Sequence, residues 1–327
     1  MRTRTFLAAA IAAALAPLPA ISFAQAAWPN QPIRLVVPYP AGGGTDFFAR
    51  VVAPGMGEAL GQPIVIENKP GASGIIGATA VAKQYPADGY TFLLGDMTTY
   101  AVNPSMFEKL SYDPQKDLAP VTLTAKFDFM LVVNPNVLPV NNVNELVAAA
   151  AKVPAGLNYG SPSIGTTHHL ATELLAKDTG ANLVAITYKG GGPAVQDLLG
   201  GQVGLMFLDR ATAKPHVESG KLRPIAAAGA TRIAAYPNLP TVAEQGLKGF
   251  AVEGWQGFTV RAGTPEPIIK ALAAAYAKTI ASPEIRRKLS EAGIDAVAST
   301  PEQFTTYMQA ETVRWRTVIK ERGIKAE

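Results

Sequence analysis

Ile33-Arg-Leu-Val-Val-Pro-Tyr-Pro-Ala-Gly-Gly-Gly-Thr-Asp46 is the stretch of sequence that decides the fold. Its first five residues predict a short buried strand, which the prolines at positions 38 and 40 end. Three glycines then lead into an amphipathic pattern that runs from Phe47 towards Leu60 and predicts a helix. A strand, a Gly-rich loop and a helix in this order begin a parallel βαβ unit.

The same order of elements recurs in both halves of the chain. Further strands are predicted at residues 63–67, 91–94, 129–133, 157–159, 183–188, 203–207 and 224–228, with an extended apolar stretch at 250–260. Further helices are predicted at residues 144–152, 168–177, 194–199, 265–281, 283–292 and 301–322. This alternation predicts an α/β protein with two lobes, each built on a doubly wound sheet. Because the last helices lack strands of their own, we expect them to pack on the first lobe, which gives two crossings between the lobes and a hinge.

The first residues predict export. Arg2 and Arg4 precede an apolar, alanine-rich segment at residues 6–19, and small residues follow where a signal peptidase would cut, near Ala24 or Ala26. A membrane anchor is the weaker interpretation, because prolines interrupt the segment and it is too short to span a bilayer. The expected division of the chain is a signal peptide at 1–26, the first part of lobe 1 at 27–127, lobe 2 at 128–248 and the second part of lobe 1 at 249–327.

Composition excludes several classes of function. The chain has no cysteine, so disulfides, thiolate metal sites and cysteine nucleophiles are excluded. The formal net charge is +4, and the Lys and Arg residues are scattered, so we expect no nucleic-acid partner. The dinucleotide pattern G-x-G-x-x-G would need glycine at Phe47 or at Val195, and G-x-x-x-x-G-K-[ST] does not occur. We therefore expect no cofactor.

The Gly-rich loop before the first helix is the first candidate site. Gly42, Gly43 and Gly44 expose backbone N–H groups at the positive end of a helix dipole, and glycines let a ligand approach closely. Asp46 is suited to capping this helix rather than to contacting an anion. The pattern favours an anion site, and an ordinary tight turn is the alternative interpretation.

A loop in the second lobe is the other candidate. The hydroxyl groups of Ser161, Ser163 and Thr166 suit hydrogen bonding to a carboxylate. Such hydroxyls can also cap the N-terminus of the helix that follows. A nucleophile elbow around Ser163 would need glycine at position 161. His169 and its neighbour His168, with a glutamate four residues on, lack a third convincing metal ligand, so we expect no metal site.

The sequence does not decide between two roles for three aromatic side chains. Phe127, Phe129 and Trp255 could contact a ligand, which would make an aromatic acid plausible, or belong to the core.

Short segments with a family likeness extend from Trp28 to the last helix. They are Pro38-Tyr-Pro-Ala-Gly-Gly-Gly-Thr-Asp46-Phe-Phe-Ala-Arg50, Val65-Ile-Glu-Asn-Lys-Pro-Gly-Ala-Ser-Gly74, Asp88-Gly-Tyr-Thr91, Asn103-Pro104, Tyr188-Lys-Gly-Gly-Gly-Pro193, Gly200-Gly-Gln-Val203, Ser219-Gly-Lys-Leu-Arg223, Pro240-Thr-Val-Ala-Glu244 and Gly263-Thr-Pro265. In this order they resemble the Bug family, the extracytoplasmic receptors of tripartite tricarboxylate transporters.

The resemblance implies a two-lobe periplasmic-binding-protein fold, a periplasmic location and binding of organic acids, namely di- or tricarboxylates, acidic amino acids or aromatic acids. It also implies that the loops at 39–46 and 161–169 hold a carboxylate, partly through waters. Two departures concern the second lobe: Ser163 stands where glycine is expected, and Leu208 stands where aspartate is expected, with Asp209 next. The expected ligand-binding set is Tyr39, Ala41, Gly42, Gly43, Thr45, Asp46, Ser73, Thr98, Ser161, Ser163, Gly165, Thr166, His169, Tyr188 and Asp209.

These observations predict a receptor that closes its lobes on a small carboxylate, and not an enzyme. The expected partners are the ligand and membrane transporter subunits, with the receptor itself monomeric. Two alternatives remain. One is an exported hydrolase that uses Ser163 with His169 on a carboxylate ester, and the other is a sensory receptor for the same ligands.

Overall fold

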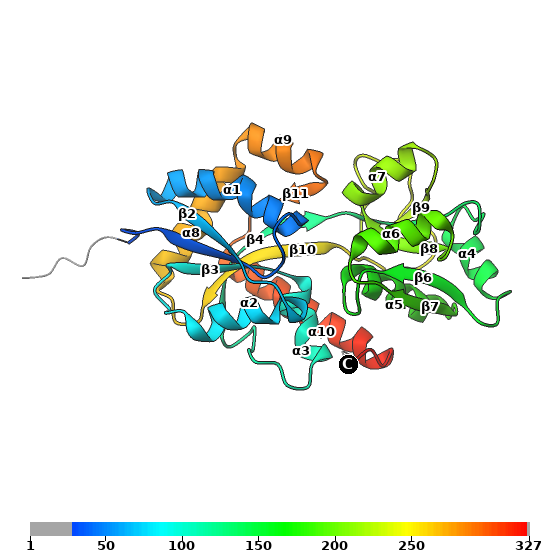
Figure 1. Cartoon of the computed structure of the whole chain (residues 1–327), viewed down its shortest axis with the longest axis horizontal. Helices are drawn as coiled ribbons and strands as arrows, with labels where there is room; N and C mark the ends of the chain where they lie inside the picture. Colours follow the sequence, from blue (N-terminus) through cyan, green and yellow to red (C-terminus); the bar gives the residue numbers. More distant parts are fainter. Residues whose placement is uncertain (1–27, 326–327) are drawn as a thin grey trace, which may run out of the picture.

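Two lobes, each built around one β-sheet, lie side by side along the long axis of the molecule (Figure 1). The computed structural model describes residues 28–325, so the predicted signal peptide at 1–26 lies outside the described residues. Within that part of the chain, no helix combines the length and the apolar character needed to cross a membrane. The predicted α/β class with two sheets is confirmed.

The first sheet has six strands. Their order is β11 (Ile294–Ala296), β4 (Leu118–Phe127), β10 (Gly254–Arg261), β3 (Thr91–Asp96), β1 (Ile33–Val37) and β2 (Ile64–Asn68). Strands β1, β2 and β3 are parallel, as predicted, whereas β10 runs antiparallel to both of its neighbours and β11 runs antiparallel to β4. The sheet is therefore mixed, and β10 enters it only after the chain has passed through the second lobe.

Alternate residues of β1 face two different helical layers. Ile33, Leu35 and Val37 pack with α1 (Gly44–Leu60), α8 (Glu266–Ile280) and α9 (Pro283–Glu291), while Val36 belongs to the core on the opposite face. That opposite face is covered by η2 (Ala72–Gly74), α2 (Ile75–Thr79), η3 (Ala80–Gln84), η4 (Thr98–Val102), α3 (Asn103–Met106) and α10 (Pro301–Glu321). Because both faces of the sheet are covered, β1 is buried almost throughout, and its alternate residues contribute to two different cores.

The second sheet has five strands. Their order is β7 (Leu183–Thr187), β6 (Leu157–Ser161), β8 (Leu205–Asp209), β5 (Phe129–Val133) and β9 (Arg223–Ala227). Strands β7, β6 and β8 are parallel, and β5 is antiparallel to both β8 and β9. The helices of this lobe are α4 (Val143–Ala150), α5 (Thr167–Thr179), α6 (Gly191–Gly200) and α7 (Arg210–Glu218). This sheet is mixed too, because β5 runs against both of its neighbours.

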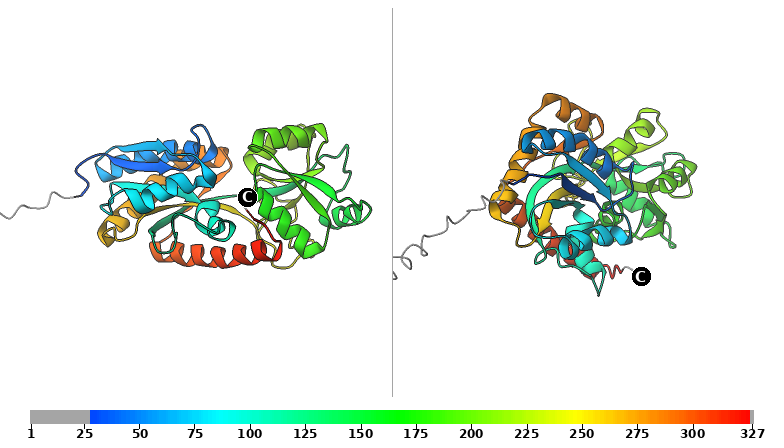
Figure 2. Two further views of the ribbon diagram at one scale, coloured as in Figure 1. Left: turned by 60° about the horizontal axis from the view of Figure 1, so that its bottom comes forward. Right: turned by 60° about the vertical axis from the view of Figure 1, so that its left-hand side comes forward.

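The lobes are joined by two neighbouring stretches of chain and are also bridged by a helix. The chain leaves the first sheet at Phe127 and returns at Gly254, and these two residues pair with each other. Helix α10 packs on β4 and reaches α5 of the second lobe (Figure 2). There Arg322 Nε lies 2.7 Å from Glu173 Oε2. The cavity described below is therefore bordered by a double crossing of the chain.

Candidate functional site

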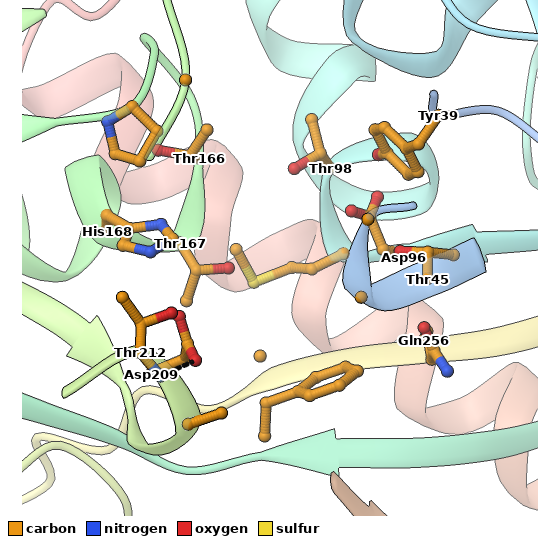
Figure 3. Close-up of a pocket in the computed structure, with 18 of the residues that line it drawn as sticks. Tyr39, Thr45, Asp96, Thr98, Thr166, Thr167, His168, Asp209, Thr212 and Gln256 are labelled. Atoms are coloured by element: carbon orange, nitrogen blue, oxygen red, sulfur yellow. Dashed lines mark hydrogen bonds between the residues drawn. The ribbon is translucent and has the colours of Figure 1, made fainter. Parts of the chain in front are cut away.

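A cavity of about 1000 Å³ lies between the lobes. Loops at the ends of β1 and β3 form one wall, loops before α5, α6 and α7 form the opposite wall, and the start of β10 borders both (Figure 3). Gly293, just before β11, lies against Ala211 of α7, where a Cβ on the glycine would be 3.0 Å from the Ala211 Cβ. The two walls thus meet at this rim.

The start of α1 presents backbone rather than side chains to the cavity. Gly43 is the N-cap residue, and its extended backbone (φ −80°, ψ 171°) leaves α1 without a side-chain cap. The N–H groups of Gly44 and Thr45 therefore have no acceptor inside the helix. Both residues line the cavity. Together with the helix dipole, this arrangement favours an anion.

Asp46 orders this loop from behind. Its Oδ2 accepts hydrogen bonds from the N–H of Gly42 and from Arg50 Nε, both at 2.8 Å, and its Oδ1 accepts from Asn68 Nδ2 at 3.0 Å. The hydrogen bonds from Arg50, reinforced by Gly42 and Asn68, lower the pKa of Asp46 to about 2. The side chain is buried and does not line the cavity. The Gly42 N–H is thus occupied within the protein, so the available donors begin one residue later.

Asp96, at the end of β3, brings a carboxylate to the first-lobe wall. Its Oδ1 accepts from both the N–H and the hydroxyl of Thr99 at 3.0 Å, and burial raises its pKa. Tyr39 lies beside it, with burial and the nearby Asp96 raising the tyrosine pKa well above its usual value. Ser73 borders the same wall in a left-handed conformation (φ 53°). Its carbonyl oxygen accepts from Asn103 Nδ2 at 3.1 Å, a contact that supports this strained backbone.

In the second lobe, loop hydroxyl groups serve the loop itself. The carbonyl oxygen of Ser163 accepts from Ser161 Oγ at 2.7 Å and from Thr166 Oγ1 at 3.0 Å. Thr166 also caps α5, because its Oγ1 accepts from the N–H of His169 at 3.4 Å. Ser161 is fully buried and does not line the cavity. Capping, one of the two roles that the sequence left open, is therefore present.

Of the two histidines, the first reaches the cavity. The ring of His168 packs edge-on against Phe129, with centroids 5.0 Å apart, and burial lowers its pKa to about 4. His169 is buried away from the cavity, and its Nδ1 accepts from the N–H of Gly165 at 3.3 Å. No group of three or more His, Asp or Glu residues within residues 28–325 is placed to hold a metal ion.

Asp209 ends β8 and begins α7. Its Oδ1 accepts from the N–H of Thr212 at 2.9 Å, so it is the N-cap residue of α7 while also lining the cavity. Leu208, which stands where the family resemblance places an aspartate, is buried in the core between the sheet and α6 and α7. The acid that faces the cavity is therefore one position later.

The start of β10 supplies aromatic surface and a buried amide. Trp255 is 1% exposed, and its Nε1 donates to Glu311 Oε2 at 3.0 Å, so it is a core residue that also borders the cavity. Phe127 and Phe129 line the same region. Gln256 is fully buried, lines the cavity, and neither its Nε2 nor its Oε1 has a hydrogen-bond partner. A buried amide without partners needs a water or a ligand group to satisfy it.

Comparison with known proteins decides the family. Residues 48–324 match the sequence model described as "Tripartite tricarboxylate transporter family receptor". The chain belongs to this receptor family. Protein BugT of Bordetella pertussis is 36% identical to it over 299 residues, which cover 91% of each chain. The predicted resemblance to the Bug family is confirmed.

Solved structures agree with this membership of the receptor family. "R. palustris Rpa4515 with adipate" has a TM-score of 0.81 and 38% identity, and the match covers 91% of this chain and 99% of that one. "MatC (Rpa3494) from Rhodopseudomonas palustris with bound malate" has a TM-score of 0.77 and 32% identity, covering 89% and 100%.

The structure brings most of the predicted site residues of this family member to one cavity. Those that line it are Tyr39, Gly42, Gly43, Thr45, Ser73, Thr98, Ser163, Thr166, Tyr188 and Asp209. Those that do not line it are Ala41, Asp46, Ser161, Gly165 and His169. Lining residues that the sequence reasoning did not name as ligand contacts include Gly44, Asp96, Met97, Thr167, His168, Lys189, Gly190, Thr212 and Gln256. Asp96 and Thr212 lie beside strand ends, so extending the strand-end rule would have found them.

Proposed function

We propose that this chain is an extracytoplasmic solute-binding receptor that holds a small organic carboxylate between its two lobes. The observation that carries the proposal is the uncapped start of α1 at the interlobe cavity. Free N–H groups at a helix N-terminus, with little side chain to obstruct them, suit a carboxylate. The partnerless amide of Gln256 in the same cavity supports a polar occupant.

The similar structures point to the same ligand chemistry. Adipate and malate, named with two of the proteins compared above, are both small carboxylates. These two proteins are each more than 30% identical to this chain over most of its length. Binding of a small acid in this cavity is therefore the function that the family relationship supports best.

Binding without catalysis is part of the proposal. In the hydrolase alternative, Ser163 would need to give its hydroxyl proton to His169. His169 is buried and its Nδ1 already accepts from Gly165, and within residues 28–325 no hydrogen bond joins the two side chains. The geometry thus favours a receptor over an enzyme.

The remaining parts of the proposal concern location and partners. We place the receptor in the periplasm after removal of residues 1–26 near Ala24 or Ala26, as a monomer that presents its closed form to membrane transporter subunits. We assign residues 27–127 and 249–327 to the first lobe and 128–248 to the second. The paired segments at Phe127 and Gly254 would act as the hinge.

Native mass spectrometry of the purified protein is the first test. An acid that co-purifies, or that stabilises the protein against heat and gives a one-to-one calorimetric isotherm, should be recovered unchanged after release. Conversion of that acid by the protein would favour the enzyme instead. If no member of a panel of aliphatic and aromatic acids binds, the proposed ligand class is wrong.

A further inference from the structure

The geometry points to Asp209 as a specificity-determining residue. Asp209 makes this receptor bind an acid that has one carboxylate and a hydrogen-bond donor at its other end more tightly than a dicarboxylate of the same length. This inference rests on the proposed function, because it assumes that the first carboxylate occupies the start of α1. It concerns what the second lobe accepts at the other end of the ligand.

The charged side chains that line the cavity include one carboxylate on each wall. Among the described lining residues they are Asp96, Asp209 and Lys189. Asp96 belongs to the first-lobe wall, where its Oδ1 is already held by Thr99. On the second-lobe wall Asp209 faces the cavity, and no cation within residues 28–325 forms a salt bridge with it. The second wall therefore carries a negative charge that no ion pair offsets.

The cations nearest in sequence or position do not compensate Asp209. Arg210 is directed elsewhere, with its Nε 3.2 Å from Asp128 Oδ2 and its Nη2 3.8 Å from Asp295 Oδ1. His168 lies on the same wall, but burial lowers its pKa to about 4, so its ring is uncharged at neutral pH. Lys189 borders the cavity, yet its side chain is exposed to solvent.

The helix starts of the second lobe offer less to an anion than the start of α1. Helix α6 also lacks a side-chain cap, but Gly191 and Gly192 are not among the lining residues, and the Gly190 N–H donates to Pro162. Thr167 and His168, at the start of α5, lie on the same wall as Asp209 (Figure 3), and their N–H groups have no acceptor within the helix. The Asp209 charge partly offsets the positive potential there.

A ligand that crosses the cavity meets these two walls at its two ends. With one carboxylate at Gly44 and Thr45, the aromatic side chains of Phe127 and Phe129 can border its middle. A second carboxylate near Asp209 would add like-charge repulsion between two anions. An ammonium, amide or hydroxyl group there could instead donate to the free Oδ2 of Asp209. Asp209 thus works as a repulsive element against dicarboxylates, which is a common source of specificity.

The test compares acids of nearly identical shape and different charge. Adipate and its monoamide form an aliphatic pair, and terephthalate and its monoamide form an aromatic pair. For at least one pair, we expect calorimetry of the wild-type protein to show about tenfold tighter binding of the monoamide. Asp209→Asn should abolish or reverse that preference, mainly by tightening the dicarboxylate. Asparagine caps helices about as well as aspartate, so α7 should remain intact.

Asp178→Asn is the matched control. It removes one negative charge from the same lobe at an exposed position near the far end of α5 and should leave the preference unchanged. Equal binding of both members of each pair, unaffected by Asp209→Asn, would overturn the inference and leave the proposed function standing. Loss of dicarboxylate binding in Lys189→Ala would also overturn the inference, because Lys189 would then be the cation that binds a carboxylate at the second wall. If no acid of any kind binds, the proposed function itself fails.

Discussion

Helices α1 and α5 approach the same cavity from opposite lobes, and their first turns are completed in different ways. Helix α1 follows Gly43 and has no side-chain cap, whereas α5 follows Thr166, whose hydroxyl accepts from the His169 N–H. Helix α7 repeats the second pattern with Asp209 as its cap. Helices α1 and α5 both keep their first two N–H groups without an acceptor inside the helix, but only the second-lobe wall adds capping side chains that the protein already uses.

This difference suggests a division of labour. Backbone N–H groups recognise a carboxylate whatever is attached to it, so the wall at α1 suits a group that all ligands of the receptor share. The second wall, with Thr166, His168 and Asp209, contains the chemistry that can differ between acids.

Filling the first-lobe wall should have the largest effect. Gly43 has an ordinary negative φ, and a Cβ there would have only the Pro40 carbonyl oxygen nearby, at 3.6 Å. Gly43→Leu should therefore fold normally while its side chain occupies the carboxylate position, weakening acid binding at least about 100-fold by calorimetry. Gly200→Leu, at an open position in α6 outside the cavity, is the control. Retained affinity in Gly43→Leu would remove α1 from the site.

A pH profile of stability tests the second wall. The pKa of His168 is about 4 in the folded protein and about 6.5 when unfolded. Because the unfolded state binds the proton more readily, stability is full above pH 6.5 and falls as the pH drops towards 4, by about 2 to 3 kcal/mol from this residue. Burial lowers the pKa of His169 as well, so the profile of His168→Phe must be subtracted from that of the wild type.

The measurement is urea unfolding at a series of pH values for both proteins. The wild type should lose more stability than His168→Phe between pH 6.5 and 4, and the two curves should run parallel above pH 7. Parallel curves over the whole range would mean that His168 is solvated and that the second wall is open to water.

A substitution at Asp46 tests whether this carboxylate orders the loop that forms the first wall. Asp46→Asn keeps the size of the side chain but removes the charge that holds Arg50 and the Gly42 N–H. Since the folded pKa of Asp46 is about 2, its contribution is present above pH 3.8 and lost as the pH falls towards 2. Arg50 is more than half exposed, so we expect a loss of only about 1 to 2 kcal/mol at pH 7, measured by urea unfolding. An unchanged midpoint would show that the loop is ordered by its glycines alone.

Sequence reasoning reached the parts of the fold and site that depend on neighbouring residues. The strand, glycine loop and helix at residues 33–60 are local features of the sequence. The loops that follow β1, β6 and β8 could likewise be recognised from the residues that follow each strand. Strand β4 was missed because Pro120 interrupts its pattern, and β11 because three residues carry too little pattern. Both are stabilised by pairing with distant segments, which no local signal reveals.

A similar cause explains why some predicted site residues do not line the cavity. Sequence pointed to His169, but α5 turns by about 100° per residue, so a shift of one position decides which histidine faces the cavity. The cap at Thr166 sets that phase. Gln256 was not recognised because its role depends on a cavity formed by segments far apart in the chain. Its unsatisfied amide is visible only once the fold is known.

The cap of α5 should give the smallest effect and test the comparison most directly. Thr166→Ala removes the acceptor of the His169 N–H and the hydroxyl that donates to the Ser163 carbonyl, and should cost about 1 kcal/mol in urea unfolding. Thr166→Ser keeps the hydroxyl and should restore most of that loss. Because the cap serves the helix, the alanine variant should lose stability more than it loses affinity for an acid. A large loss of affinity with stability unchanged would mean that Thr166 contacts the ligand, and that the second wall also holds the carboxylate.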